Sequence, residues 1–388
     1  MKKTILIATF LLSKTLLAQS LPGCELILTK TEYTPKSEII KKLLKNGSFQ
    51  ELEGNLIGRL KAYETGNDSD LLIYRDINFA LAKSPDLEGS VQKFISTNPR
   101  SYFSNLIAGI YYTNSGFEAR GTGLASDTSQ QKIDLMQQRF DKSKSFLTVA
   151  LTINPKSSMP YAPMLNMAAA SSGTDSAKIM LSESLRSDPK NVLVRSLAIS
   201  KLTPRWGGSF KTIDEVIDAA KPSGLTESQI HYLRFSQLME LGSHFWVIEK
   251  QPAMAAMYYR KALEHCINSD RAVEGFIANA KSSNDWDAVI AVSTEIEKAN
   301  FATRFVYTQR GIAFEKNNKL ESAIKDYEQA SKLGDAWSTG MLGYLYMIGK
   351  GVPKDILKAR ALLTTAASQG DESAKKQLDW LNSQSNKN

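Results

Sequence analysis

The chain has 388 residues, of which 42% are hydrophobic and 23% are charged, with only 12 prolines. This composition is that of an ordinary globular protein, long enough for a continuous core, and it excludes a largely disordered chain. The net charge is +8, and three of the positive charges fall in the first twenty residues, which contain no acid, so the rest carries +5. Because that excess is spread over many helix faces, it favours solubility and excludes nucleic acid as the expected partner.

The first twenty residues have the layout of a secretory signal peptide. Two lysines precede an apolar run over residues 5–12, and the small residues Ala18 and Ser20 stand at the minus-three and minus-one positions of a cleavage site. The run is interrupted from Ser13 onwards, far short of the length that a membrane span needs. We therefore expect cleavage after Ser20, export to the periplasm, and no transmembrane segment in the mature chain.

The two cysteines, Cys24 and Cys266, leave two questions open. A lipid anchor at Cys24 is the alternative processing route, because Gly23 precedes it, although Pro22 and Lys14 fit the pattern of a lipoprotein signal poorly. An oxidising compartment could instead join the two thiols in a disulfide. Unlinked, Cys266 would be a packed residue at the end of an apolar helix stripe.

A pattern of small, aromatic and small residues occurs twice, 68 residues apart. Half of that interval, 34 residues, is the period of the tetratricopeptide repeat, a pair of antiparallel helices that must stack on its neighbours to bury its apolar face. The pattern therefore predicts an all-α solenoid in which the small residues lie where helices approach most closely. The two copies are Ala255, Tyr259 and Ala262, and Ala323, Tyr327 and Ala330.

Three further units end on the pairs Asn98-Pro99, Asn154-Pro155 and Asp188-Pro189. Proline cannot continue a helix, and the residue before it is pushed out of the helical region, so each pair predicts a helix end. The small-residue position stands twelve residues before each proline, and the residues four and seven places later share its helix face. The predicted repeat origins are Leu87, Ser143, Ala177, Ala255, Val289 and Ala323.

Two intervals between these origins exceed the repeat period, by 22 residues after Leu87 and by ten after Ala177. Insertions in a solenoid emerge on one face, which is often the binding face. We therefore expect two inserted interaction loops. Their candidate residues are Arg120, Gly121 and Gly123 in the first, and Arg205, Trp206, Gly207 and Gly208 in the second.

The last part of the chain changes to a longer repeat. The pairs Gly334-Asp335 and Gly370-Asp371 are 36 residues apart, and the segment between them resembles a Sel-one-like repeat. Residues 304–337 resemble the parent tetratricopeptide pattern, with Gly311 at its small position, and residues 371–380 resemble the first helix of a capping unit. The Sel-one-like positions are Gly343, Gly349, Gly351, Ala359 and Ala367, and the glycines fit a loop that needs positive φ.

The segment from about residue 43 to residue 220 resembles an uncharacterised bacterial family of unknown function. The resemblance depends on Gly47-Ser48-Phe49, on the ARGTG motif at residues 119–123 and on the PRWGGS motif at residues 204–209. That family implies the helical fold and no particular activity.

We expect five segments along the chain. Residues 1–20 are the signal peptide, and residues 21–220 are a helical domain of tetratricopeptide-like hairpins with the two loops. Residues 221–303 are degenerate tetratricopeptide-like units, and residues 304–382 are the tetratricopeptide and Sel-one-like repeats with their cap. Residues 383–388 are a frayed tail.

The second loop has two interpretations. As a recognition loop, it would use Trp206 as an aromatic anchor and Arg205 as a clamp for an anion or a carboxylate, since both residue types are common in binding hot spots. As a turn, it would reverse the chain at its two glycines, cap the next helix with Ser209 and bury Trp206 in a gap between units. Arg120 has the same ambiguity.

No pattern in the sequence predicts catalysis, a metal or a cofactor. His231, His244 and His265 do not form the pair four residues apart of a helical zinc site, and His265 and Cys266 point in different directions on a helix. Neither loop has the length or the lysine of a phosphate-binding loop.

The sequence therefore predicts an exported protein-interaction scaffold without catalytic activity, for example in envelope assembly or as an adaptor that protects against a toxin. The resemblance to exported Sel-one-like proteins implies those two roles and, as a third, interaction with a host cell. The alternative is an envelope protein that binds a carbohydrate or cell-wall fragment in a cleft where the loops converge, with Trp206, Arg205, Tyr111 and Tyr112 as its contacts.

Overall fold

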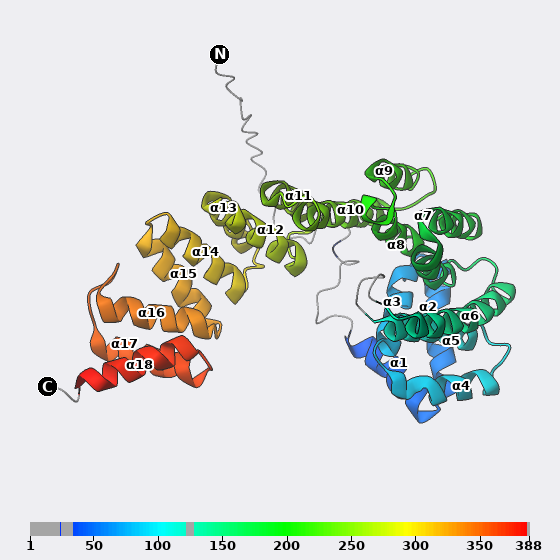
Figure 1. The fold of residues 1–388 in the computed structure, drawn as a ribbon, viewed down its shortest axis with the longest axis horizontal. Helices are drawn as coiled ribbons and strands as arrows, with labels where there is room; N and C mark the ends of the chain where they lie inside the picture. Colours follow the sequence, from blue (N-terminus) through cyan, green and yellow to red (C-terminus); the bar gives the residue numbers. More distant parts are fainter. Residues whose placement is uncertain (1–23, 25–33, 122–127, 386–388) are drawn as a thin grey trace, which may run out of the picture. The chain divides into compact units, whose positions relative to one another are not determined.

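The computed structural model describes residues 24, 34–121 and 128–385, and every regular element in these ranges is helical (Figure 1). The expected all-α class, a solenoid of helical hairpins, is confirmed. The described residues form two compact units, which divide between Phe276 and Ile277. We call them the N-terminal unit and the C-terminal unit. The expected signal peptide lies outside the described residues.

The N-terminal unit has one continuous apolar core, which runs from Ile40 in its first helix to Leu233. Most consecutive helices pack as neighbours, and the most extensive pairing joins α5 to α6. The elements are α1 (Thr34–Asn46), α2 (Phe49–Glu64), α3 (Asp70–Leu81), η2 (Pro85–Leu87), α4 (Glu88–Thr97), α5 (Tyr102–Arg120), α6 (Gln130–Ile153), α7 (Tyr161–Ser187), α8 (Leu193–Lys201), η4 (Pro204–Trp206), α9 (Phe210–Asp218), α10 (Glu227–Val247) and α11 (Pro252–His265).

The C-terminal unit is a regular series of helices of 13 or 14 residues. From α13 onwards each helix packs on the next, and α12 crosses the division between the two units. Its elements are α12 (Asp270–Ser282), α13 (Trp286–Lys298), α14 (Arg304–Lys316), α15 (Leu320–Lys332), α16 (Ala336–Ile348), α17 (Ile356–Ser368) and α18 (Glu372–Ser385).

The predicted repeat positions are buried in every unit. At each of the six origins, the residue itself and those four and seven places later are at most 8% exposed. The same spacing recurs on α17 at Ala359, Leu363 and Ala366, which are completely buried. Ala367, which is expected to be a Sel-one-like position, is partly buried. The neighbour Ala366 is seven places after Ala359 and therefore faces the core.

Glycines on the first helix of several hairpins receive the large side chain from the middle of the second helix. A Cβ atom at Gly311 would lie 2.6 Å from the ring of Tyr327, and one at Gly343 would lie 2.8 Å from Leu363. Gly242 meets the ring of Tyr259 in the same way, at 2.9 Å. The repeat therefore pairs a missing side chain with a large one, which lets the two helix backbones approach closely.

The three predicted proline stops are confirmed. Helices α4, α6 and the second part of α7 end at the residue before each pair, and Asn98, Asn154 and Asp188 are their C-caps. Within α7, Gly173 has φ of +78° and ψ of −168°, so the element is two helices joined at this glycine. Residues 161–187 are thus the predicted hairpin, with an unusually short connection.

The first insertion is mainly helical and not a loop, which corrects the expectation. Helix α5 has 19 residues and α6 has 24, and the two pack along much of their length. A Cβ atom at Gly109 would lie 2.4 Å from Leu147, and one at Gly116 would lie 2.7 Å from Phe140. Most of the extra residues therefore lengthen a tight helix pair.

The Sel-one-like loop between α16 and α17 has the predicted backbone. Gly349 has φ of +73° and Gly351 has φ of +76°, values that glycine adopts without strain. The Asp355 N–H donates to the Tyr346 carbonyl at 3.0 Å, and the Asp355 carboxylate accepts from the Lys358 N–H at 2.9 Å, which caps α17. The expected capping helix is present as α18, which extends to Ser385 and so includes part of the segment expected to fray.

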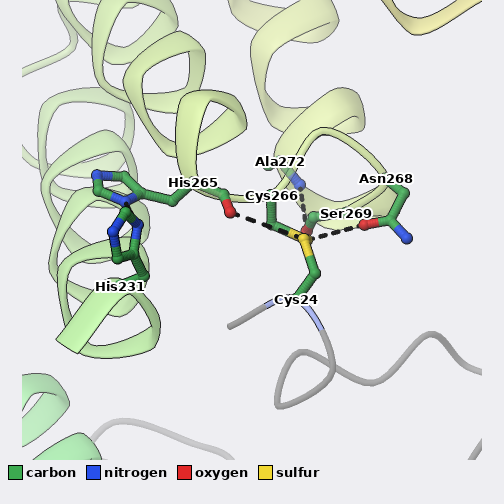
Figure 2. The surroundings of a disulfide bond; sticks show 7 residues. All are labelled: Cys24, His231, His265, Cys266, Asn268, Ser269 and Ala272. Carbon is green, nitrogen blue, oxygen red and sulfur yellow. Dashed lines mark hydrogen bonds between the residues drawn. A yellow bond between two sulfur atoms is a disulfide. The ribbon is translucent and has the colours of Figure 1, made fainter. Parts of the chain in front are cut away.

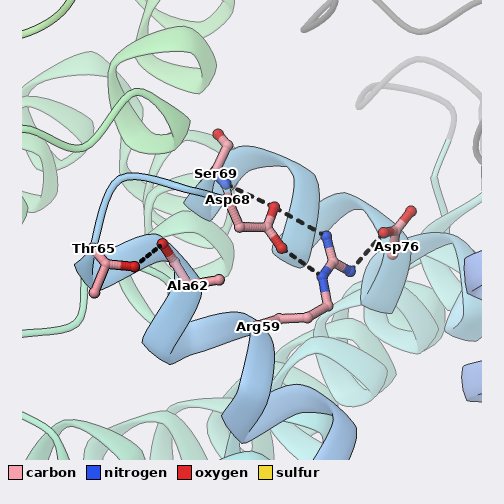
Figure 3. A network of polar contacts seen from close by, with 6 residues as sticks. All are labelled: Arg59, Ala62, Thr65, Asp68, Ser69 and Asp76. Carbon is pink, nitrogen blue, oxygen red and sulfur yellow. Dashed lines mark hydrogen bonds and ion pairs between the residues drawn. The ribbon is translucent and has the colours of Figure 1, made fainter.

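Ion pairs of Arg59 on α2 link this helix to α3 (Figure 3). Its guanidinium donates to Asp68 at 2.8 Å and to Asp76 at 2.7 Å, and Asp68 also accepts from the Ser69 N–H. Asp76 is almost completely buried, so its carboxylate depends on Arg59 for a partner. These contacts fix the turn between the two helices.

Cys24 and Cys266 form a disulfide (Figure 2), which answers the question that the sequence left open. Their Cα atoms are 5.3 Å apart, and both side chains are buried. Cys266 is the C-cap of α11, so the bond ties the start of the described chain to the junction of α11 and α12. A sulfur in a disulfide cannot also carry a thioether-linked lipid, so this pairing and a lipid anchor at Cys24 are mutually exclusive.

Candidate interaction surfaces

The second predicted loop, residues 202–209, is a tight turn that we call the Arg205 loop. Gly207 has φ of +84°, and a Cβ atom at Gly208 would lie 2.0 Å from the Leu202 carbonyl oxygen, so both positions require glycine. The Ser209 hydroxyl accepts from the Thr212 N–H at 3.1 Å and caps α9, as predicted. The turn interpretation therefore explains the glycines and the serine.

Trp206 does not fill a gap between units, and that part of the turn interpretation is wrong. Its side chain is 41% exposed. The Lys201 ammonium lies 5.4 Å from the centre of its ring, and the Arg205 guanidinium lies 5.5 Å from it, both within cation–π range. The loop thus presents an exposed indole with two cations.

The first predicted loop is only partly described. Arg120 is the last residue of α5, and Gly121 is its C-cap with φ of +80°. Gly123 lies outside the described residues. Among the described residues, no hydrogen bond or ion pair joins Arg120 to the Arg205 loop. Whether either loop binds a partner stays a prediction.

Two aromatic residues of the predicted carbohydrate cleft are core residues. Tyr111 and Tyr112 are each 3% exposed. The Tyr111 hydroxyl donates to the Pro85 carbonyl at 3.3 Å, and Tyr112 stacks on Phe146. They hold α5 against its neighbours and are not available to a sugar.

A hollow of about 510 Å³ opens on the C-terminal unit between α14 and the start of α16. Its walls include two aromatic residues, Phe305 and Trp337, which are 37% and 39% exposed. Exposed aromatic side chains beside a hollow are typical of a protein-binding surface. The lining residues are Arg304, Phe305, Thr308, Gln309, Ile312, Asp335 and Trp337.

Helix α16 extends this apolar surface. Trp337, Met341, Tyr344 and Ile348 follow each other at intervals of four, three and four residues, so they lie on one face of the helix. Tyr344 and Ile348 are exposed, and Met341 is partly buried. We call Phe305, Ile312 and these four residues the α14–α16 surface. This surface was not predicted from the sequence, although the spacing on α16 is a helical periodicity that could have indicated it.

Two charged side chains, Arg304 and Asp335, line the hollow. Arg304 donates to the Gly334 carbonyl at 3.3 Å, and the Lys281 ammonium donates to the Gln309 side chain at 2.6 Å. Burial lowers the pKa of Lys281. The carboxylate of Asp335 is engaged, because it accepts from the Ser338 N–H at 2.8 Å and caps α16.

A buried ion pair holds α14 in place. The Arg310 guanidinium donates twice to Asp326 on α15, at 2.8 and 2.7 Å, and once to Glu297 on α13, at 2.6 Å. Asp326 and Arg310 are almost completely buried. Although burial opposes its charge, the hydrogen bonds to Asp326 and Glu297 raise the pKa of Arg310, so the guanidinium stays charged. The pair fixes the helix that carries Phe305 and Ile312.

The histidines do not gather at either surface. His231 and His265 face each other with 3.1 Å between their Nδ1 atoms, on the side away from the disulfide (Figure 2). His244 lies 3.3 Å from Glu249 and packs on Phe210. Within the described ranges, no three His, Cys, Asp or Glu side chains come together as a metal site would require.

The fold defines this chain as a helical-repeat protein of the tetratricopeptide and Sel1 type. Two segments match the Sel1 repeat, residues 238–265 and 340–371. The second includes most of the predicted Sel-one-like segment, whereas the first was assigned to degenerate tetratricopeptide-like units. Its signal was Leu241-Gly242, which matches Leu342-Gly343 in the second repeat. The resemblance of residues 43–220 to an uncharacterised family stays a prediction.

Among solved structures, a Sel1 repeat protein from Oxalobacter formigenes is 14% identical, with a TM-score of 0.35 over 93% of this chain and 94% of the other. A protective antigen of uropathogenic Escherichia coli with an SLR fold is 15% identical, with a TM-score of 0.31 over 88% and 81%. Similarities this low do not constrain what the chain binds. No curated protein matches it.

Repeats of this class are typical of protein-interaction scaffolds. In the described ranges, the structure has no helix with both the length and the apolar character of a membrane span.

Proposed function

We propose that this chain is an exported scaffold without catalytic activity that binds another protein through the α14–α16 surface. The observation that carries this proposal is the hollow with two half-exposed aromatic walls, Phe305 and Trp337, on a unit that contains a Sel1 repeat. Clustered aromatic residues with an arginine at the rim are the residue types that supply most binding energy at interfaces. Envelope assembly and protection against a toxin are the two roles that such a scaffold would serve.

Export is supported by the disulfide. Cysteine pairs persist in oxidising compartments and are rare in the cytosol. Cys24 follows the expected cleavage site after Ser20 by only four residues, so it would remain in the mature chain. Mass spectrometry of the mature protein tests this: we expect Leu21 as the first residue and no free thiol. An intact N-terminus at Met1 or two free thiols in the cell would overturn export.

The binding proposal is tested by capture from an envelope extract. The double variant Phe305→Ala/Trp337→Ala should recover at least about tenfold less of one specific protein than the wild type does. Leu357→Ala is the matched control, because Leu357 is 82% exposed on the same unit and does not line the hollow. Equal recovery by all three proteins would remove this surface from the interface. The captured protein itself would distinguish an assembly partner from a toxin.

The alternative function, binding of a carbohydrate or cell-wall fragment, loses two of its four proposed contacts because Tyr111 and Tyr112 are buried. A thermal-shift series with cell-wall fragments separates it from the scaffold proposal. Stabilisation by a fragment, without a protein partner, would favour the alternative.

A further inference from the structure

Three cations interact electrostatically with one carboxylate near the Arg205 loop. Lys201 at the end of α8, Arg205 in the loop and Arg271 on α12 all interact electrostatically with Glu240 on α10. None of the three cations forms an ion pair within 4.0 Å of a carboxylate among the described residues. The cluster therefore has excess positive charge that no close contact neutralises.

Of the three cations, Lys201 is the one for which the lack of a close counter-ion matters most. Its side chain is only partly exposed, and burial lowers its pKa, with Arg205 acting in the same direction and Glu240 against it. A desolvated ammonium without a close counter-ion costs free energy. A carboxylate supplied from outside would compensate that cost.

We propose that the Arg205 loop is a docking site for an acidic segment of a partner protein. Carboxylates of that segment pair with Lys201 and Arg205, and an apolar side chain of the segment covers the exposed part of Trp206. Arginine and tryptophan are the side chains that most often carry binding energy at interfaces, and here they are adjacent. Gly207 and Gly208 permit the tight backbone turn on which the two side chains lie next to each other.

The arrangement favours a carboxylate over a neutral sugar. A sugar binds tryptophan by stacking its C–H face on the indole, which must be free. Here the ring of Trp206 is approached by Lys201 at 5.4 Å and by Arg205 at 5.5 Å. Cations that rest on an indole keep their remaining N–H groups free for an anion, so the same geometry that hinders stacking assists pairing with a carboxylate.

This site lies on the N-terminal unit, whereas the α14–α16 surface lies on the C-terminal unit. The two proposals therefore fail independently: variants at the Arg205 loop test this one, and variants of Phe305 and Trp337 test the other.

The test is a binding measurement with the full mature chain. The probe is a fluorescent peptide in which glutamate alternates with leucine, and its twin carries glutamine in place of every glutamate. We expect the glutamate peptide to bind, the glutamine peptide not to bind, and the affinity to fall as salt is added. Lys201→Gln and Arg205→Ala should each weaken binding about tenfold, whereas Trp206→Phe should keep more affinity than Trp206→Ala.

Lys132→Ala is the matched control, because Lys132 is an exposed lysine on α6 of the same unit. Circular dichroism and a thermal melt confirm that every variant folds. Equal binding of both peptides, no binding of the glutamate peptide, or an affinity that Lys201→Gln and Arg205→Ala leave unchanged would overturn the proposal. Binding of a neutral chitin oligosaccharide that depends on Trp206 would overturn it in favour of a carbohydrate site.

Discussion

The Cα atom of Gly311 on α14 lies directly against the ring of Tyr327 on α15, so closely that a Cβ atom would be 2.6 Å from the ring edge. Tyr327 is completely buried, and its hydroxyl donates to Glu315 at 3.2 Å. The ring therefore cannot move aside without losing both its packing and its hydrogen bond. The spacing of α14 and α15 depends on this contact.

Gly311→Ala should destabilise the C-terminal unit by about 1–3 kcal/mol through overpacking. A loss of stability would be informative, because alanine is the better helix former by about 1 kcal/mol and would otherwise stabilise the helix. Gly58→Ala on α2 is the control, since nothing lies within 4 Å of the Cβ position there, and it should leave stability unchanged or increase it. Urea unfolding of both variants provides the measurement. A stabilising effect at both sites would show that the contact with Tyr327 is loose.

Ala330→Leu should also cost about 1–3 kcal/mol, because Ala330 is completely buried at the last position of its repeat trio. Ala361→Leu on α17 is the matched control, because Ala361 is exposed. Thermal unfolding should separate the two variants clearly. Identical melting temperatures would contradict the packing that the repeat register predicts.

Asp326→Ala should destabilise the C-terminal unit by roughly 3–5 kcal/mol, because it leaves the buried guanidinium of Arg310 without its main partner. The double variant Arg310→Met/Asp326→Leu replaces the pair by apolar side chains and should recover most of the loss. Denaturant titration of the single and double variants measures this. A double variant as unstable as the single one would mean that the pair itself stabilises the unit.

The Asp70 carboxyl is buried where two helices begin. It accepts from the Leu71 N–H at 2.8 Å and from the Leu193 N–H at 3.3 Å, at the start of α3 and α8. Burial, with the charge of Asp188 as a second cause, raises the pKa of Asp70 to about 7. The pKa of an aspartate in the unfolded chain is about 3.9.

The folded state therefore holds a proton that the unfolded state has lost, and this contribution to stability falls as the pH rises from about 4 to about 7. Asp70→Asn removes the titrating carboxyl group. Urea unfolding at about pH 5 and about pH 8 should show a larger decrease in stability for the wild type than for Asp70→Asn. Parallel pH profiles would show that the carboxyl titrates normally.

Replacing both cysteines by serine should destabilise the N-terminal unit by roughly 2–5 kcal/mol, because the disulfide closes a loop with a sequence separation of 242 residues. Hydrogen exchange measures the protection of backbone amides in each unit separately. This protection should fall in α1–α11 and stay unchanged in α14–α18. A reductant should have the same effect on the wild type and none on the double variant. Unchanged protection in α1–α11 would contradict the prediction.

The sequence predicted the repeat architecture well because a repeat is a local pattern. The positions around Ala177, Ala255 and Ala323 are spaced by helix geometry, so burial follows from counting. Of the adjacent alanines Ala366 and Ala367, the one seven places after Ala359 is completely buried, and the other is partly buried.

Other features depend on contacts that no local pattern encodes. Arg59 finds Asp76 across a turn, and Cys24 finds Cys266 across the whole N-terminal unit. The exposure of Trp206 also follows from tertiary packing, because the same turn could have pointed the indole inwards. Phe305 and Trp337 lie on different helices, α14 and α16. Only the folded arrangement of these helices shows that the two side chains line the same hollow.

The order in which the chain is made gives the disulfide a particular role. Cys24 is synthesised 242 residues before its partner, so its thiol must wait until α1–α11 have all emerged. The bond therefore cannot guide the early stacking of hairpins. It closes this unit between Cys24 and the end of α11, so an oxidised Cys24–Cys266 pair would report that both ends of the N-terminal unit have been made and have met.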